Sequence, residues 1–191
     1  DKTNSLLFPV ISGVQDEMER KIKEISNESD SIGGILETMI LGLPVGIGSP
    51  MFDSLESMIS HAMFSIGAVK GIEFGAGFDF AKMLGSQAND QIKVENSKVV
   101  TCSNNNGGVN GGISNGMPVT FNLVVKPTPS ISKEQDTINL TSLTNEKLVI
   151  KGRHDPAIIR RVNVVVRAMT AFVVADLLIA RYGEEVLKKG F

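Results

Sequence analysis

The sequence is poor in residues that form covalent or metal-mediated cross-links. Its only cysteine is Cys102, and its two histidines are His61 and His154. A single cysteine excludes an intramolecular disulfide, and the lack of a disulfide framework is typical of the reducing cytoplasm. One cysteine and two distant histidines, with no CxxC or HxxxH spacing, cannot assemble a typical zinc site. We therefore expect a cytoplasmic protein without a metal site.

Aromatic residues and net charge are also scarce. The chain has no tryptophan, a single tyrosine and a formal net charge of −2, so it lacks the basic surface and the stacking residues of a nucleic-acid-binding protein. The most apolar region, residues 162–180, is interrupted by Asn163, Arg167 and Asp176. It thus lacks the unbroken run of about 18 apolar residues typical of a membrane span. We expect neither nucleic acid nor a membrane as a partner.

What is present is the composition of an ordinary globular protein. Apolar residues make up 42% of the chain and charged residues 21%, which is far from the composition of disordered proteins. A length of 191 residues is sufficient for one substantial hydrophobic core. We therefore predict a single domain over residues 1–191.

Three segments have the pattern of helices. Apolar residues recur at helical spacing in residues 13–26, and Ser49 with Pro50 predicts the start of a second helix. The last helix is expected between Pro156 and Tyr182, with either Asp155 or Asn163 as its N-terminal cap.

Strands are predicted from runs of branched and aromatic residues bounded by glycine or proline. These runs lie at residues 33–46, 68–75, 118–127 and 146–152, and at residues 33–46 the periodicity also fits a helix. They alternate with helices but show no repeated βαβ pattern. The sequence therefore favours an α+β sandwich over a doubly wound parallel sheet.

A long polar segment, residues 102–118, contains five glycines and five asparagines. Glycine-rich backbone lets N–H groups approach a ligand, so the segment is typical of a functional loop. A mobile surface hairpin fits the composition equally well. Its glycines do not match a P-loop or a GxGxxG motif, which disfavours a dinucleotide-binding or kinase-like enzyme.

Two further segments favour anions. In "VVKPTPS", residues 124–130, a lysine follows an apolar strand and two prolines stiffen the chain near two hydroxyl groups, an arrangement that suits phosphate. A Pro-rich turn is the alternative. In "KGRHDPAIIRRV", residues 151–162, Arg153 can bind phosphate or carboxylate and Asp155 can accept a proton, whereas His154 is expected on the opposite side of an extended chain. An ion-paired helix entrance is the alternative for this cluster.

Taken together, "SIGAVKGIEFGAGF", "NGGVNGGISNGMPV", "VVKPTPSI" and "KGRHDPAIIRRV" resemble, in order and spacing, the C-terminal half of the chorismate synthase family. The resemblance implies a β-α-β sandwich, with helices between antiparallel sheets, of which this chain forms roughly the C-terminal half. It implies a phosphate-eliminating carbon-oxygen lyase that converts 5-enolpyruvylshikimate 3-phosphate to chorismate by 1,4-anti elimination, using reduced FMN. It further implies a homotetramer, an association with NADP, and a place in the shikimate pathway of aromatic amino acid biosynthesis.

The resemblance also assigns roles to individual residues. Asp155 would be the catalytic residue near the flavin N5, where it accepts or relays a proton, and Arg153 would also bind substrate. The cofactor-binding residues would be Gly67, Ala68, Gly111, Lys126, Pro127, Thr128, Pro129, Ser130 and Arg153.

Part of the family pattern has no counterpart in this sequence. The two histidines usually assigned as proton donors, an Arg-Ser-Ser flavin segment and several substrate-binding arginines belong to the N-terminal half of the family, and His61 and His154 do not match those histidines. We therefore expect the chain alone to be inactive. The alternative is a non-catalytic module for flavin or phosphate binding or for assembly.

Overall fold

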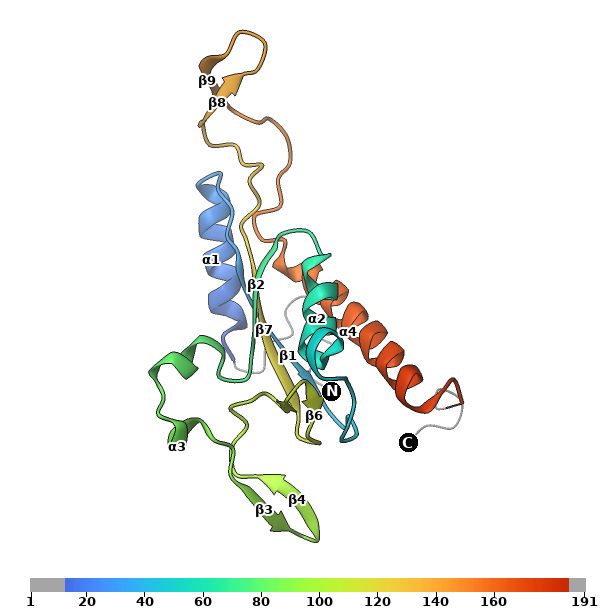
Figure 1. Ribbon diagram of the computed structural model, residues 1–191. Coiled ribbons are helices and arrows are strands. Elements are labelled where there is room, and N and C mark those ends of the chain that lie inside the picture. The colour runs from blue at the N-terminus through green and yellow to red at the C-terminus, as the bar shows by residue number, and fades with distance from the viewer. Residues whose placement is uncertain (1–12, 186–191) are drawn as a thin grey trace. The chain divides into compact units, whose positions relative to one another are not determined.

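The computed structural model describes residues 13–185 (Figure 1). The chain divides into two compact units. The first unit comprises residues 1–34 and 125–162, and the second comprises residues 35–124 and 163–191. The single domain over residues 1–191 stays a prediction.

The second unit is built around a three-stranded sheet with strand order β1-β7-β2 (Figure 1). Its strands are β1 (Gly34–Ile40), β7 (Val119–Val125) and β2 (Val69–Phe74), and the terminal residues of β1 and β7 belong to the first unit. All three strands lie inside segments predicted as strands from their branched and aromatic residues.

The central strand β7 shows why the sheet forms. Val119, Phe121, Leu123 and Val125 are all at most 1% exposed, whereas the residues between them are more accessible. This alternation buries one complete face of the strand. The ring of Phe121 also lies 5.6 Å from that of Phe74 on β2, within the range of favourable aromatic pairs.

Helix α2 (Leu55–Phe64) packs against β2 and buries Leu55, Ile59, Ala62 and Met63. Its N-terminal cap is Ser54, whose hydroxyl accepts a hydrogen bond of 3.0 Å from the N–H of Ser57. The predicted start at Ser49 and Pro50 is therefore wrong. Those residues precede the short 3₁₀ helix η2 (Met51–Asp53), and the helix begins where a hydroxyl satisfies one of its free N–H groups.

The remaining elements of the second unit are short. These elements are η3 (Gly77–Lys82), α3 (Gly85–Ala88), β3 (Ile92–Glu95), β4 (Lys98–Thr101), β5 (Val109–Asn110) and β6 (Ile113–Ser114). β3 and β4 form one antiparallel hairpin and β5 and β6 another. Residues 102–118, predicted as a loop, therefore contain a small hairpin.

The first unit contains α1 (Gln15–Asn27) and the antiparallel hairpin of β8 (Gln135–Asn139) and β9 (Thr144–Leu148). Helix α1 confirms the predicted helix. The strand expected at residues 146–152 forms only in part, because β9 ends at Leu148, four residues before the end of that range. Residues of β9 are exposed throughout, so its register follows pairing with β8 rather than burial.

The long C-terminal helix α4 (Ile159–Tyr182) begins in the first unit and continues in the second. Asn163 lies inside it. Asp155 instead holds the irregular entrance, because its Oδ1 accepts a hydrogen bond of 3.0 Å from the N–H of Ala157.

By length and composition α4 could cross a membrane, with a mean hydropathy of 2.0 over its most apolar 18 residues, despite the polar residues within it. Core helices of soluble proteins meet the same criterion, so this is weak evidence for a span. Val166, Val173, Leu177 and Leu178 of this helix are buried. The interspersed helices and antiparallel hairpins confirm the predicted α+β class.

Candidate functional site

Residues 126–130 continue from the end of β7 without regular secondary structure. The chain is held by the segment just before β1. Ser31 donates a hydrogen bond of 2.6 Å from its hydroxyl to the carbonyl oxygen of Thr128, and the N–H of Ser132 donates to the carbonyl oxygen of Ser29 at 3.2 Å. These bonds fix the backbone on both sides of Ser130.

The side chains of this segment leave polar groups available. Lys126 is exposed. Among the described residues, the hydroxyl oxygen of Thr128 is buried and has no hydrogen-bond partner. An unpaired buried hydroxyl costs roughly 1–3 kcal/mol, so a group that paired with it would remove a local penalty.

His154 joins this segment to the second anion-favouring segment. Its Nδ1 lies 3.1 Å from the hydroxyl of Ser130, and its Nε2 lies 3.1 Å from the carbonyl oxygen of Ile150. The two segments, 24 residues apart at this contact, therefore meet within the first unit. His154 therefore bonds directly to Ser130, and the expectation that it points away from Arg153 and Asp155 stays a prediction.

On either side of His154 stand Arg153, which is exposed, and Asp155, whose side chain is 27% exposed. Asp155 Oδ2 lies 3.3 Å from Nε of Arg161, while its Oδ1 accepts the N–H of Ala157. Both oxygens of the carboxylate therefore have a partner, and its orientation is set. The ion-paired helix entrance considered from the sequence is present, and it leaves the guanidinium of Arg153 outside that pair.

The other candidate residues belong to the second unit. Gly67 and Ala68 form the turn between α2 and β2, and Ala68 has a φ of 72°. Gly111 lies exposed in the turn between β5 and β6, with a φ of 59° and no atom within 4 Å of the position that a Cβ would occupy. A ligand could therefore approach the backbone at Gly111.

The segment that leads to Gly111 is anchored by a buried carboxylate. Asp90, 7% exposed, accepts hydrogen bonds from the Ser103 hydroxyl at 2.6 Å and from the N–H groups of Asn105 and Asn106 at 2.7 and 2.8 Å. Burial raises the pKa of Asp90, but these hydrogen bonds outweigh it and lower the pKa below the ordinary value. Sequence reasoning missed Asp90, because no local pattern marks a carboxylate whose partners lie 13 to 16 residues away.

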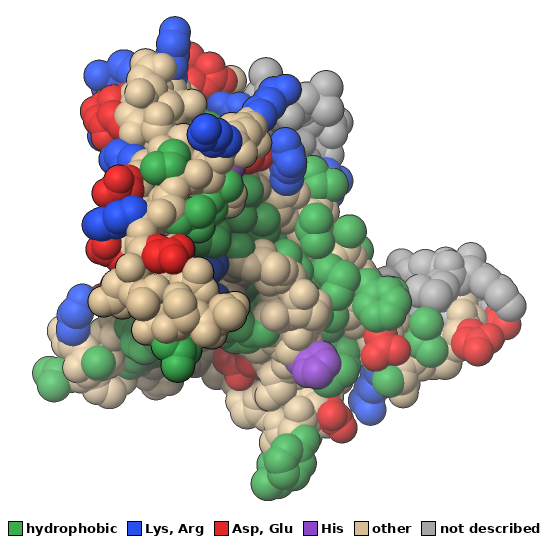
Figure 2. Space-filling model, turned by 90° about the horizontal axis from the view of Figure 1, so that it is seen from above, with side chains coloured by type: hydrophobic (Ala, Val, Ile, Leu, Met, Phe, Trp, Pro, Cys, Tyr) green, Lys and Arg blue, Asp and Glu red, His purple; other side chains and the backbone are tan. Residues whose placement is uncertain are grey.

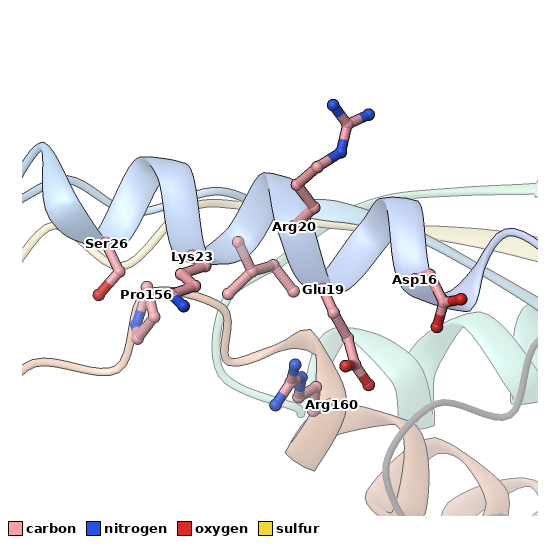
Figure 3. A pocket seen from close by; sticks show the side chains of 8 residues that line it. Asp16, Glu19, Arg20, Lys23, Ser26, Pro156 and Arg160 are labelled. Atoms are coloured by element: carbon pink, nitrogen blue, oxygen red, sulfur yellow. The ribbon is translucent and has the colours of Figure 1, made fainter.

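A cavity of about 590 Å³ lies in the first unit, between α1 and the start of α4 (Figure 3). Asp16, Glu19 and Lys23 of α1 line it together with Arg160. These acidic and basic side chains give the cavity no single sign of charge. None of the residues assigned to flavin or substrate from the sequence lines it.

Comparisons with known proteins give one consistent result. The family model of chorismate synthase matches residues 2–179. The chorismate synthase of Dehalococcoides mccartyi (strain ATCC BAA-2266 / KCTC 15142 / 195) is 51% identical over 156 residues, which are 82% of this chain and 43% of the relative. That of Methanococcus maripaludis is 46% identical over 180 residues, which are 94% of this chain and 48% of the relative.

The fold agrees. A crystal structure of chorismate synthase superimposes with a TM-score of 0.72 at 32% identity, covering 89% of this chain and 44% of that one. This similarity confirms the expected fold. The chain thus spans less than half the length of the relatives it matches. Family model, sequence identity and fold together show that the chain belongs to the chorismate synthase family.

Proposed function

We propose that this chain forms the C-terminal part of an enzyme that eliminates phosphate from 5-enolpyruvylshikimate 3-phosphate to give chorismate, with reduced FMN as cofactor. Family membership supports the reaction. The observation that carries the proposal is the bond between Ser130 and His154. It joins the segment that carries Lys126 to the segment that carries Arg153 and Asp155, so that residues of both segments are available to one ligand.

The residues present fit a flavin mononucleotide. Its phosphate needs cations and donors, and Lys126 and Arg153 are exposed while the Thr128 hydroxyl has no partner among the described residues. Lys126, Pro127, Thr128, Pro129, Ser130 and Arg153 would hold the cofactor, and the resemblance assigns Gly67, Ala68 and Gly111 to cofactor binding as well. When bound, the reduced flavin supplies transient electron density to the substrate as phosphate leaves.

The chain's own residues would orient the reactants and move a proton. Arg153 offers a planar pair of donors to a phosphate or carboxylate, and a preorganised donor aimed at developing charge lowers a barrier by about 3 kcal/mol. Asp155 would accept or relay a proton near the flavin N5. Its bonds to Ala157 and Arg161 hold the carboxylate in one orientation, so little reorganisation accompanies that transfer.

A chimera tests the proposal. In it, this chain replaces the matching segment of the Dehalococcoides mccartyi relative, and chorismate formation is measured anaerobically with reduced FMN. We expect turnover by the chimera and a loss of at least about 100-fold with Asp155→Asn, the scale typical of removing an acid-base group. Glu134→Gln, at an exposed acid in the same unit, is the control and should leave turnover unchanged.

The chain by itself is expected to form no chorismate. Chorismate formation by the 191 residues alone would refute this. If the chimera is inactive but the chain binds FMN, a non-catalytic flavin-binding or assembly module becomes the better description.

We also propose that the protein acts as a homo-oligomer in the cytoplasm, a tetramer by resemblance, within the shikimate pathway and with the association with NADP that the resemblance implies. Apolar side chains reach its surface (Figure 2). On α4, Val164 and Phe172 are 68% and 69% exposed, and exposed apolar surface favours association. Light scattering tests this, and a monodisperse monomer would contradict it.

A further inference from the structure

The imidazole of His154 is bonded at both nitrogens, which decides where its proton lies. A backbone carbonyl oxygen only accepts hydrogen bonds. Nε2, 3.1 Å from the carbonyl oxygen of Ile150, must therefore carry the proton. In the neutral ring Nδ1 is then an acceptor, so the Ser130 hydroxyl at 3.1 Å donates to it.

This arrangement uses the only proton of the Ser130 hydroxyl. Toward any ligand the oxygen of Ser130 then presents lone pairs alone, which repel an anion. A doubly protonated ring reverses the bond. Nδ1–H would donate to Ser130, the hydroxyl proton of Ser130 would become free to donate outward, and the ring would add a positive charge.

We propose that His154 is the positioning residue that sets the direction of the Ser130 hydroxyl, and that a dianion such as a phosphate group binds at Ser130 with uptake of one proton by His154. Only the identity of the anion, as a phosphate of the cofactor or of the substrate, rests on the proposed function. The direction of the Ser130 hydroxyl follows from the geometry of the chain itself.

Charged groups on the segments bonded to this cluster act on the same equilibrium. Lys126, Lys151 and Arg153 favour the anion, whereas Asp155 is paired with Arg161. Asp30 and Lys133, on segments bonded to this one, compensate each other at 2.7 Å. Of the groups named, Asp155, Asp30 and Lys133 are in ion pairs, so the balance among them is positive, which favours an anion. The direction of the Ser130 hydroxyl is set by the hydrogen bonds of the ring.

Nuclear magnetic resonance of the chain labelled with ¹⁵N tests the position of the proton on the His154 ring. Only two histidines are present, and His61→Asn, at the exposed histidine of α2, leaves the His154 signals alone. We expect the neutral ring to carry its proton on Nε2. A ring protonated on Nδ1, or an average of both tautomers, would overturn the proposal whether or not the protein binds flavin.

Titration with sulfate tests whether a dianion binds at Ser130 with uptake of one proton. Sulfate stays a dianion between pH 5 and 8, the range in which histidine changes charge, and ionic strength is held constant because screening alters anion binding. We expect sulfate to shift the amide signals of Lys126, Thr128 and Ser130, since the two prolines between them have no N–H. Affinity should rise by up to about tenfold per pH unit as pH falls, as uptake of one proton requires. The His61→Asn variant should keep this slope.

Two variants separate the contributions. His154→Asn places an amide near Nδ1 that can donate or accept, so it should bind sulfate with no slope. Ser130→Ala should bind more weakly at low pH and with a shallower slope, because the hydroxyl donor is gone while the charge of the ring remains. An unchanged slope in both variants would refute the coupling and leave the proposed function intact. A correct tautomer with no sulfate binding would instead reject residues 126–130 as an anion site, and with it this part of the proposed function.

Discussion

The buried carboxylate of Asp90 offers a quantitative test of how the chain positions Gly111. Replacing Asp90 with Asn keeps the shape but turns one oxygen into an NH₂ group, a donor. In either orientation of the amide, that donor faces at least one of the donors that Asp90 now satisfies, namely the Ser103 hydroxyl and two backbone N–H groups. The variant therefore loses charge-assisted hydrogen bonds and leaves a buried N–H or O–H group without a partner.

The expected loss follows from these contacts. Hydrogen bonds to a charged group contribute about 1.5–3 kcal/mol each, and an unsatisfied buried donor costs about 1–3 kcal/mol. We expect Asp90→Asn to lower the free energy of unfolding by about 3 kcal/mol, a large part of the 5–15 kcal/mol typical of a domain.

The contribution of Asp90 to the free energy of unfolding should depend on pH, and the sign of this dependence follows from the pKa of Asp90. The pKa of Asp90 is lowered in the folded state from its ordinary value of 3.8, so its contribution is complete above that value. It disappears as pH falls below 3.8 through the lower, folded-state pKa. The difference between wild type and variant should therefore be constant near neutrality and shrink in that acidic window.

Urea denaturation gives the free energy, and hydrogen exchange at the amides of Asn105 and Asn106 gives the local effect. Asp79→Asn is the matched control, because Asp79 is 65% exposed and pairs only at the surface with Lys82, where ion pairs contribute little. Equal losses for the two variants, within about 0.5 kcal/mol, together with unchanged exchange at both amides, would refute the reasoning.

Three further substitutions probe the elements around the site, each measured by urea denaturation. Phe121→Ala should lower the free energy of unfolding by about 3–5 kcal/mol because it empties a fully buried position. Its control Phe78→Ala, at a residue that is 83% exposed, should change stability by less than about 0.5 kcal/mol. Similar losses in the two variants would contradict the burial of Phe121. Ser54→Ala removes the cap of α2 and should cost about 1 kcal/mol, and an unchanged midpoint would rule out that role. Gly107→Ala should cost at least about 2 kcal/mol, because φ is +59° and a Cβ would lie 2.5 Å from the nitrogen of Gly75, while Gly85→Ala, with open space around it, should be tolerated.

Elements with a strong local pattern were predictable. Strand β7 alternates fully between buried and accessible residues, and β2 lies between glycines that bound its branched residues. In both cases the local sequence was sufficient to predict the strand. The start of α2 was predicted wrongly, since Ser49 with Pro50 and Ser54 are comparable local signals. The choice between them depended on the bond that Ser54 makes to Ser57 and on the burial of Leu55.

The residues of the candidate site also differ in how far the sequence could predict them. Arg153, Asp155 and Lys126 could be selected from the sequence because their side-chain chemistry and the spacing of the motifs are properties of the sequence. The partners of His154 and Asp90 could not, because each bond joins residues that are 24 or 13 to 16 positions apart.

By itself, then, the sequence determined the α+β class, the family and the chemical types that favour an anion, because composition, periodicity and motif order are fixed along the chain. Only the tertiary structure decided that His154 bonds to Ser130 and that Asp90 anchors residues 103–106. Hydrogen bonds depend on distance and direction in space. Folding alone brings such distant donors and acceptors within about 3 Å of each other.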